Sequence, residues 1–137
     1  MSTPMIEVAG IWEIGRNVPI MEADLWKCAL RSYGIKHLNM TPITGIHAPW
    51  ITEFTGVDRI VEAYPDHVPV FVDERSDTEL EDFEHPANPL YVFGRSNFSP
   101  FSDMAKGHRS LRIDCVQTGM LWPHQCLPMI LRDRSMQ

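Results

Sequence analysis

The sequence lacks the features that mark membrane and secreted proteins. No stretch of its 137 residues approaches the roughly 18 to 20 consecutive apolar residues of a membrane span. Residues 1–7 lack the basic and apolar regions of a signal peptide. Cysteine is scarce: Cys28, Cys115 and Cys126 are odd in number and have no C-x-x-C spacing, so we expect reduced thiols that fill the core. These absences predict a cytoplasmic protein.

Several common catalytic signatures are also missing. The chain has no G-x-x-x-x-G-K-[ST] loop, no G-x-G-x-x-G after a strand and no G-x-S-x-G turn, which argues against nucleotide hydrolysis, dinucleotide binding and serine hydrolysis. The histidines form no H-x-H or H-E-x-x-H arrangement, and His124 with Cys126 is too sparse for a site of about four ligands. We therefore predict no metal.

Positive charge is in short supply. The net charge of −6 disfavours broad, non-specific affinity for nucleic acid, because that affinity depends on Lys and Arg neutralising phosphates. A local basic patch is compatible with this balance. Among the four tryptophans, Trp50 lies in a Pro-flanked loop and is the one we expect to be exposed enough to stack on a base, whereas Trp12, Trp26 and Trp122 are expected to pack in a core or interface.

What is present is enough for one domain over residues 1–137, because 44% of the residues are hydrophobic. Apolar runs predict five strands, at residues 8–14, 35–40, 68–72, 90–93 and 111–116. Helical spacing predicts helices at residues 20–33, 54–64 and 123–134. The first helix carries two apolar rows and is expected to be buried on more than one side.

A short acidic helix is expected between the third and fourth strands. Thr78 and Glu81 have the spacing of a capping box, in which each side chain satisfies a free backbone N–H of the first turn. The helix should run to about Glu84. Strands that alternate with helices in this way predict an α/β fold with a mostly parallel sheet and helices on both faces.

Three segments of the chain resemble the motif regions of the SpoU-type SPOUT RNA methyltransferases. Gly34, the strand 35–40 and Pro42 match the frame that follows the first motif helix, and Leu90-Tyr91-Val92-Phe93-Gly94 is similar to the second motif, a strand ending in Phe-Gly. Residues 112–115 and 120–122 stand where the third motif has Ile-Pro and Ser-Leu-Asn.

Several polar positions depart from the family pattern. Cys28 occupies the position of the first-motif Arg, and Glu22 and Asp24 fall near its Asn and Gly positions. Arg95 begins the segment that replaces the second motif's small residue and Glu. Because Glu22 and Asp24 start a helix, a favourable interaction with the helix dipole is the preferred interpretation over a general base.

The resemblance implies a C-terminal trefoil knot, a homodimer and S-adenosylmethionine held mainly by backbone groups of the loops after the fourth and fifth strands. The cofactor positions carried over are Phe93, Gly94, Arg95, Asp114, Cys115, Val116 and Leu121.

Methyl transfer to a ribose 2′-hydroxyl needs an aligned donor and a group that offsets the departing proton. In the family this role falls to the first-motif Arg, which Cys28 cannot replace. Arg16, Arg31 and Arg95 are the candidate substitutes, and for each a solvated surface guanidinium is the alternative.

Two functions follow from the resemblance. The first is an S-adenosylmethionine-dependent RNA methyltransferase that acts on tRNA, with rRNA as the other RNA substrate. The alternative is a catalytically inactive SPOUT-fold derivative that serves as a binding or assembly module, which the lost motif residues and the acidic charge favour.

Overall fold

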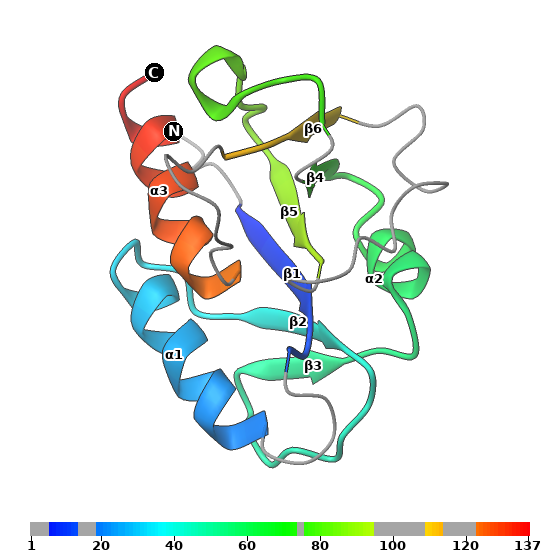
Figure 1. The fold of residues 1–137 in the computed structure, drawn as a ribbon. Coiled ribbons are helices and arrows are strands. Elements are labelled where there is room, and N and C mark those ends of the chain that lie inside the picture. The colour runs from blue at the N-terminus through cyan, green and yellow to red at the C-terminus, as the bar shows by residue number, and fades with distance from the viewer. Residues whose placement is uncertain (1–5, 14–18, 74–75, 95–108, 114–122) are drawn as a thin grey trace.

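A computed structural model of the chain describes residues 6–13, 19–73, 76–94, 109–113 and 123–137. Its strands are β1 (Glu7–Ile11), β2 (Leu38–Thr41), β3 (Ile51–Glu53), β4 (Val68–Val72), β5 (Pro89–Phe93) and β6 (Arg109–Leu111). Its helices are α1 (Pro19–Arg31), α2 (Val57–Ala63) and α3 (Pro123–Ser135), and the 3-10 turn η1 (Leu80–Asp82) lies between β4 and β5. Figure 1 shows this arrangement.

The six strands form one sheet in the order β3-β2-β1-β5-β4-β6 (Figure 1). All neighbouring strands are parallel. Ala9 of β1, for example, lies opposite Asn39 of β2 and Val92 of β5. The carboxyl ends of the strands therefore meet at one edge, and β1 and β5 occupy the centre of the sheet.

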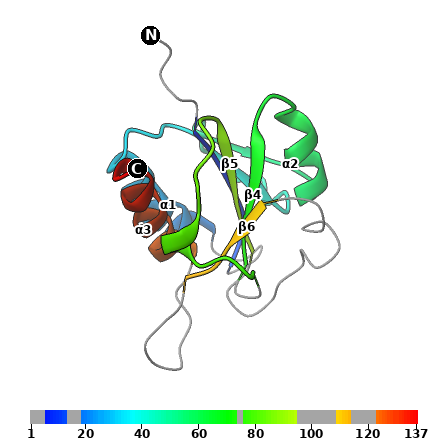
Figure 2. The same ribbon diagram turned by 90° about the horizontal axis from the view of Figure 1, so that it is seen from above.

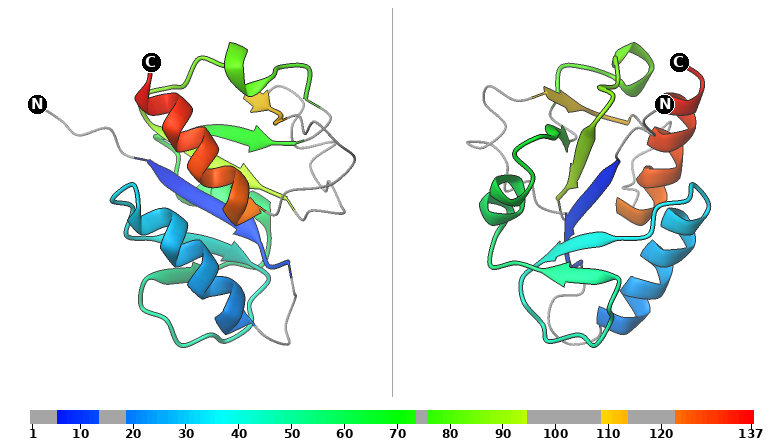
Figure 3. Two further views of the ribbon diagram at one scale, coloured as in Figure 1. Left: turned by 60° about the vertical axis from the view of Figure 1, so that its left-hand side comes forward. Right: turned by 180° about the vertical axis from the view of Figure 1, so that it is seen from behind.

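Helices cover both faces of the sheet, as the sequence predicted. Helices α1 and α3 lie side by side on one face, and α2 covers the other (Figures 2 and 3). Successive residues of β5 alternate between the two layers: Tyr91 and Phe93 face α1 and α3, whereas Leu90 and Val92 join the smaller core under α2. The fold is thus a three-layer α/β/α arrangement.

A missing side chain on β1 lets α1 approach the sheet. A Cβ atom added to Gly10 would lie 3.2 Å from the Trp26 ring and 3.3 Å from the Met40 sulfur. Trp26 is fully buried, so its indole occupies the space that a side chain at Gly10 would need. This contact fixes the first helix against the centre of the sheet.

The predicted strand and helix order is largely confirmed. The strands expected at residues 8–14, 35–40, 68–72 and 90–93 correspond to β1, β2, β4 and β5, and all three long helices are present. Strand β6 begins two residues before the expected position, and residues 114–116 lie outside the described part of the chain. Strand β3 was not predicted, because three residues are too few to set a period.

Within the single chain, α1 is buried on one side and not on more than one side as predicted. Trp26 and Leu30 are buried, but Met21 is 65% and Leu25 is 45% exposed. Cys28 belongs to this exposed row, so it does not fill the core as expected. The other described thiol, Cys126, is half-buried, and neither Cys28 nor Cys126 forms a disulfide within the described residues. Cys115 lies outside the described residues. Hydrophobicity alone could not show that the row faces outward.

The predicted capping box does not form. Only the 3-10 turn of η1 is present, and the residue before it, Glu79, makes no side-chain cap hydrogen bond. The backbone of this segment pairs instead with Arg112, whose N–H donates to the Thr78 carbonyl at 2.8 Å while its own carbonyl accepts from Leu80 N–H at 2.9 Å. Pairing with a distant strand end therefore overrides the local helix signal.

Two of the tryptophans form core contacts as predicted. Trp12 is 1% exposed and Trp26 is fully buried, whereas Trp50 is only half-buried. Trp122 lies outside the described residues. Within the described residues, none of the helices has the length and hydrophobicity of a transmembrane segment.

Candidate functional site

The carboxyl ends of β1 and β5 form the centre of the candidate site. The next strand after β1 is β2 on one side, whereas the next strand after β5 is β6 on the other side, beyond β4. Open α/β sheets bind ligands at such a switch point, because the diverging connections leave a crevice outside the strand ends. Helices α1 and α3 run antiparallel to β1, so both begin at this edge (Figure 3).

Two of the predicted cofactor positions meet at this point. The Phe93 side chain is 1% exposed, and its ring lies 5.6 Å from the Trp26 ring in an edge-to-face contact. It is part of the core, so only the Phe93 backbone is available to a ligand. Gly94 follows directly and is half-buried. Without a Cβ atom it leaves the backbone open to close approach.

A buried carboxylate joins the end of β1 to the start of α1. Glu22 is 1% exposed, and its two carboxylate oxygens accept from the Glu13 backbone N–H at 2.7 and 3.0 Å. The Trp26 indole N–H donates to the same carboxylate at 3.3 Å. Asp24 is exposed, so the two acidic residues at the helix start do not act as a pair. Glu22 instead fixes the end of β1.

His124, in the first turn of α3, is a polar group at this edge that the sequence did not single out for the site. Its ring stands 6.5 Å from the Trp26 ring. Burial lowers the pKa of His124 below its usual value of 6.5, and the opposing effect of the Glu22 and Glu13 carboxylates does not overcome it. The imidazole is therefore neutral at pH 7. Only the tertiary structure brings it to α1, since the two helices are about a hundred positions apart in the chain.

A second carboxylate organises the neighbouring strand ends. Glu53, at the end of β3, accepts from the Trp12 indole at 2.7 Å, from the Thr44 hydroxyl at 2.6 Å and from the Thr44 and Gly45 backbone N–H groups, each at 2.9 Å. Burial acts to raise the pKa of Glu53, but the hydrogen bonds from Thr44, Trp12 and Gly45 outweigh it and the pKa is lowered. Glu53 thus holds the loop after β2 against the end of β1.

We expect Glu53→Gln to destabilise the protein by about 1–3 kcal/mol at pH 7, because the amide cannot replace all four accepted hydrogen bonds. A carboxyl whose folded pKa is lowered contributes stability above its usual pKa of 4.5, and that stability is lost as the pH falls through the folded value. Urea unfolding of both proteins at pH 7 and at pH 3 to 4 checks this. A difference that stays constant over this range would contradict the assignment.

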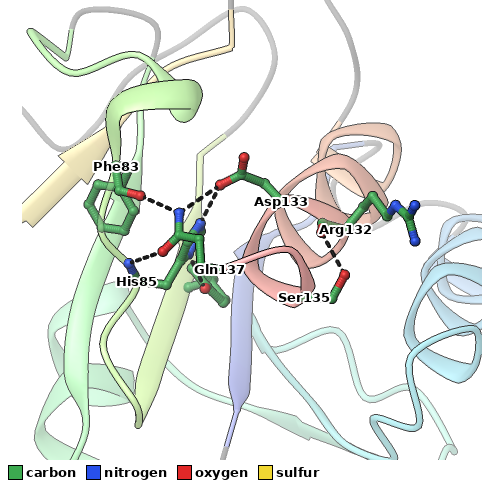
Figure 4. A network of polar contacts seen from close by, with 7 residues as sticks. Phe83, His85, Arg132, Asp133, Ser135 and Gln137 are labelled. Carbon is green, nitrogen blue, oxygen red and sulfur yellow. Dashed lines mark hydrogen bonds and ion pairs between the residues drawn. The ribbon is translucent and has the colours of Figure 1, made fainter.

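A polar network fastens the end of α3 to the segment before β5 (Figure 4). The two ring nitrogens of His85 lie 2.6 Å from the Tyr91 hydroxyl and 2.8 Å from the Asp133 carboxylate. Gln137 accepts from the His85 backbone N–H at 3.3 Å and donates to the Phe83 carbonyl at 2.7 Å. Burial raises the pKa of Tyr91, so its hydroxyl stays protonated. The network is satisfied when Tyr91 donates to His85 and His85 donates to Asp133.

The remaining predicted site residues are not brought together in the described structure. Arg16, Arg95, Asp114, Cys115, Val116 and Leu121 lie outside the described residues. Arg31 is exposed and ends α1. Since α1 runs antiparallel to the strands, Arg31 lies at their amino ends, away from Phe93 and Gly94 of the same chain. Among the described residues, no group of three or more His, Cys, Asp or Glu could hold a metal ion.

Comparison by sequence finds no relative: no family model matches the chain, and neither does any curated protein. Comparison by structure does find similar folds. An RNA methyltransferase from Bacillus anthracis, assigned as such without proof of activity, matches with a TM-score of 0.72 and 13% identity over 96% of this chain and 92% of that one. A structure concerned with 2-OH methylation of C/U34 on tRNA matches with a TM-score of 0.77 and 13% identity over 100% of this chain and 92% of that one.

A third similar structure contains a cofactor. The SpoU methyltransferase AviRb from Streptomyces viridochromogenes, in complex with AdoMet, matches with a TM-score of 0.73 and 13% identity over 100% of this chain and 59% of that one. The agreement extends over nearly the whole of the present chain in each case. The chain therefore has the fold of the SpoU-type RNA methyltransferases, the fold that its sequence motifs resemble.

Proposed function

We propose that this protein is an S-adenosylmethionine-dependent RNA methyltransferase that modifies a ribose 2′-hydroxyl of tRNA. The observation that carries the proposal is the match in fold over nearly the whole chain, with Gly94 placed directly after buried β5 at the switch point of the sheet. The proposal treats residues 1–137 as one catalytic domain that works in the cytoplasm. An rRNA substrate would use the same chemistry.

The described residues fit such a cofactor. The Phe93 and Gly94 backbone would hold it, since Gly94 has no side chain to block the approach, and Arg95, Asp114, Cys115, Val116 and Leu121 would complete the pocket. When bound, S-adenosylmethionine supplies a methyl group on a positively charged sulfur. The neighbouring carboxylates Glu13 and Glu22 give this edge a negative potential, which favours a cationic ligand.

The residues of the chain would then have two roles: to accept the proton of the 2′-hydroxyl and to bind a phosphate of the RNA. A bound S-adenosylmethionine would supply the methyl group, and a residue of the chain would have to accept the proton of the 2′-hydroxyl. His124 is neutral and stands at this edge, so we assign it that role. Arg16 and Arg95 follow β1 and β5 in sequence and are the cations proposed to hold the RNA phosphate. Arg31, at the opposite ends of the strands, is left outside this machinery.

The C-terminal trefoil knot is part of the same proposal. Helix α3 follows the segment after β6, and the His85 network holds its last turn against the segment before β5. An anchored α3 would keep a threaded loop closed around a ligand. The knot would also explain why side-chain identity at the site can change while the backbone still recognises the cofactor.

We also propose a homodimer that covers the exposed apolar row of α1 and the adjacent surface of α3. Ile20 is 66%, Met21 65% and Leu25 45% exposed on α1, and Met129 is 43% exposed on α3. Leu25→Glu should convert the dimer to a monomer, because a charge in a paired apolar interface is not solvated. Light scattering after gel filtration measures the mass, with Asp24→Ala as the control. A wild-type monomer would contradict the proposal.

Calorimetric titration with S-adenosylmethionine and S-adenosylhomocysteine tests the cofactor site. We expect saturable binding at one site, and we expect Gly94→Val to weaken it at least tenfold because the branched side chain would occupy the approach to the backbone. Ala87→Val, an exposed change at the opposite end of β5, serves as the control. No binding at millimolar ligand would exclude the methyltransferase function.

The alternative function is a scaffold with this fold and no catalysis. One observation favours it: Cys28, at the position where the family has its Arg, is an exposed thiol that cannot hold a phosphate. Absence of cofactor binding together with an intact dimer would support this alternative. Saturable cofactor binding would leave the choice to a methylation assay on unmodified tRNA with His124→Gln as the inactive variant.

A further inference from the structure

A basic pocket lies at the amino ends of β2 and β3, at the opposite edge of the sheet from Gly94. Its volume is about 410 Å³, and it lies between the last turn of α1, the turn that follows and the loop before β3. The lining residues are Lys27, Leu30, Arg31, Gly34, Ile35, Lys36 and Trp50. Ligand sites commonly have volumes of roughly 300–1,000 Å³, so the pocket can hold a nucleotide.

The pocket concentrates positive charge in an acidic chain. Lys27, Arg31 and Lys36 are three of the twelve Lys and Arg residues, and no Asp or Glu lines the pocket. Among the residues that the structure describes, none of these three cations forms an ion pair. Lys27 and Arg31 also interact favourably with the negative C-terminal end of the α1 helix dipole. Lys36 lies beyond the helix, so the dipole does not explain the whole cluster.

One wall of the pocket is a fixed aromatic ring. Trp50 is half-buried and packs against the larger core, whereas Leu30 and Ile35 are buried and form an apolar floor. The Lys27 ammonium lies 5.8 Å from the centre of the Trp50 ring. The ammonium therefore lies over one face of the ring. An aromatic face beside cations is the combination that holds an unpaired base and its phosphate.

The turn after α1 forms part of the pocket lining. Gly34 has a φ of 72°, and the N–H of Ile35 donates to the Leu30 carbonyl at 3.0 Å, which reverses the chain at the helix end. Nothing lies within 4 Å of where a Gly34 Cβ would stand. The positive φ of Gly34 thus serves the turn, and a side chain at this position would meet open space.

We propose that this pocket binds one unpaired nucleotide of an RNA, with the base against Trp50 and the phosphate between Arg31, Lys36 and Lys27. The proposal rests on the RNA substrate class proposed above, but it assigns a separate binding site, remote from the site of methyl transfer. A fixed contact at this edge would position the RNA across the sheet while its target ribose reaches the other edge.

The test compares two charge-matched double variants. Arg31→Gln with Lys36→Gln removes two charges from the pocket, and Arg59→Gln with Arg132→Gln removes two exposed charges elsewhere. All four side chains are exposed, so both doubles should fold, which thermal unfolding followed by circular dichroism verifies. The probe is a fluorescein-labelled single-stranded RNA of about ten nucleotides without S-adenosylmethionine, read by fluorescence anisotropy at several salt concentrations.

The pocket double is expected to bind the RNA at least tenfold more weakly and to reduce the slope of log K against log salt by about 0.7, since the proposed site contacts one phosphate and each phosphate contact on a single strand contributes about 0.7. The control double should change affinity less than twofold. Trp50→Leu should weaken binding about tenfold, while Trp50→Phe, which keeps a stacking ring, should weaken it less. Equal affinities of the two doubles would overturn the proposal.

Two further arms separate the sources of the ligand and the two proposed functions. The first arm tests adenosine 5′-monophosphate as the ligand. If it binds through Arg31 and Lys36 while the RNA does not bind, the RNA assignment is overturned in favour of a free nucleotide. The second arm measures the molecular mass of the Arg31→Gln, Lys36→Gln variant in solution. A change in mass relative to the wild type would overturn the RNA assignment in favour of a subunit interface. RNA binding at this pocket in a protein that fails to bind S-adenosylmethionine would support the pocket and refute the methyltransferase function.

Discussion

Glu22→Ala is expected to destabilise the protein by about 3–5 kcal/mol, because the Glu13 backbone N–H and the Trp26 indole N–H lose their acceptor and a cavity opens beside them. The carboxylate is 1% exposed, so water does not readily replace it. The end of β1 and the start of α1 are both held by this one group. Urea unfolding at pH 7, followed by tryptophan fluorescence and circular dichroism, measures the loss.

Two other variants of α1 serve as controls for the loss of stability in Glu22→Ala. Asp24→Ala removes an exposed carboxylate two residues away and should change the free energy of unfolding by no more than about 0.5 kcal/mol. Glu22→Gln keeps one acceptor oxygen and should retain most of the stability. If Glu22→Ala were as stable as Asp24→Ala, the buried hydrogen bonds would not fix this edge. A folded Glu22→Gln protein that no longer binds cofactor would place the carboxylate in the ligand site itself.

His85→Ala is expected to lower the free energy of unfolding by about 3–4 kcal/mol, because the substitution leaves the Tyr91 hydroxyl and the Asp133 carboxylate without their shared partner. The His85 side chain is 2% exposed, and its ring also packs edge-to-face against Phe83. The expected loss should appear as faster hydrogen exchange in the last turns of α3, since these turns are held by the network.

Ser135→Ala is the control for the His85 network. The Ser135 hydroxyl donates to the Arg132 carbonyl of its own helix and is exposed, so its removal should cost no more than about 0.5 kcal/mol (Figure 4). Tyr91→Phe, which deletes one hydroxyl, should fall between the two. Equal exchange in α3 for His85→Ala and Ser135→Ala would show that packing, not this network, anchors the helix.

Local sequence predicted the elements but not their partners. Three features depend only on neighbouring residues: the turn at Gly34, the apolar run of β5 and the helical spacing of α2. The structure has each of them at the expected place. Strand β3 and the pairing of Thr78 with Arg112 depend on segments far apart in the chain. No window of sequence contains both partners of such contacts.

In the candidate site, too, features that depend on neighbouring residues could be predicted, whereas features that depend on tertiary contacts could not. The end of β5 at Phe93 and Gly94 could be predicted because a strand ending in glycine is a local pattern, although the burial of the Phe93 ring was not foreseen. Glu22 could not be distinguished from Asp24, since both are acidic residues at a helix start. His124 could not be linked to them, because its place beside α1 and the burial that lowers its pKa depend on segments far apart in the chain.

The sequence by itself determined the alternation of strands and helices, and hence an α/β fold with a parallel sheet, because hydrophobic period and turn residues act over a few positions. Only the tertiary structure decided which face of α1 is buried, which carboxylate holds the end of β1, and that Lys27, Arg31, Lys36 and Trp50 share one pocket. Burial, charge clustering and hydrogen-bond satisfaction depend on segments that the fold brings together, so they are properties of the packed chain.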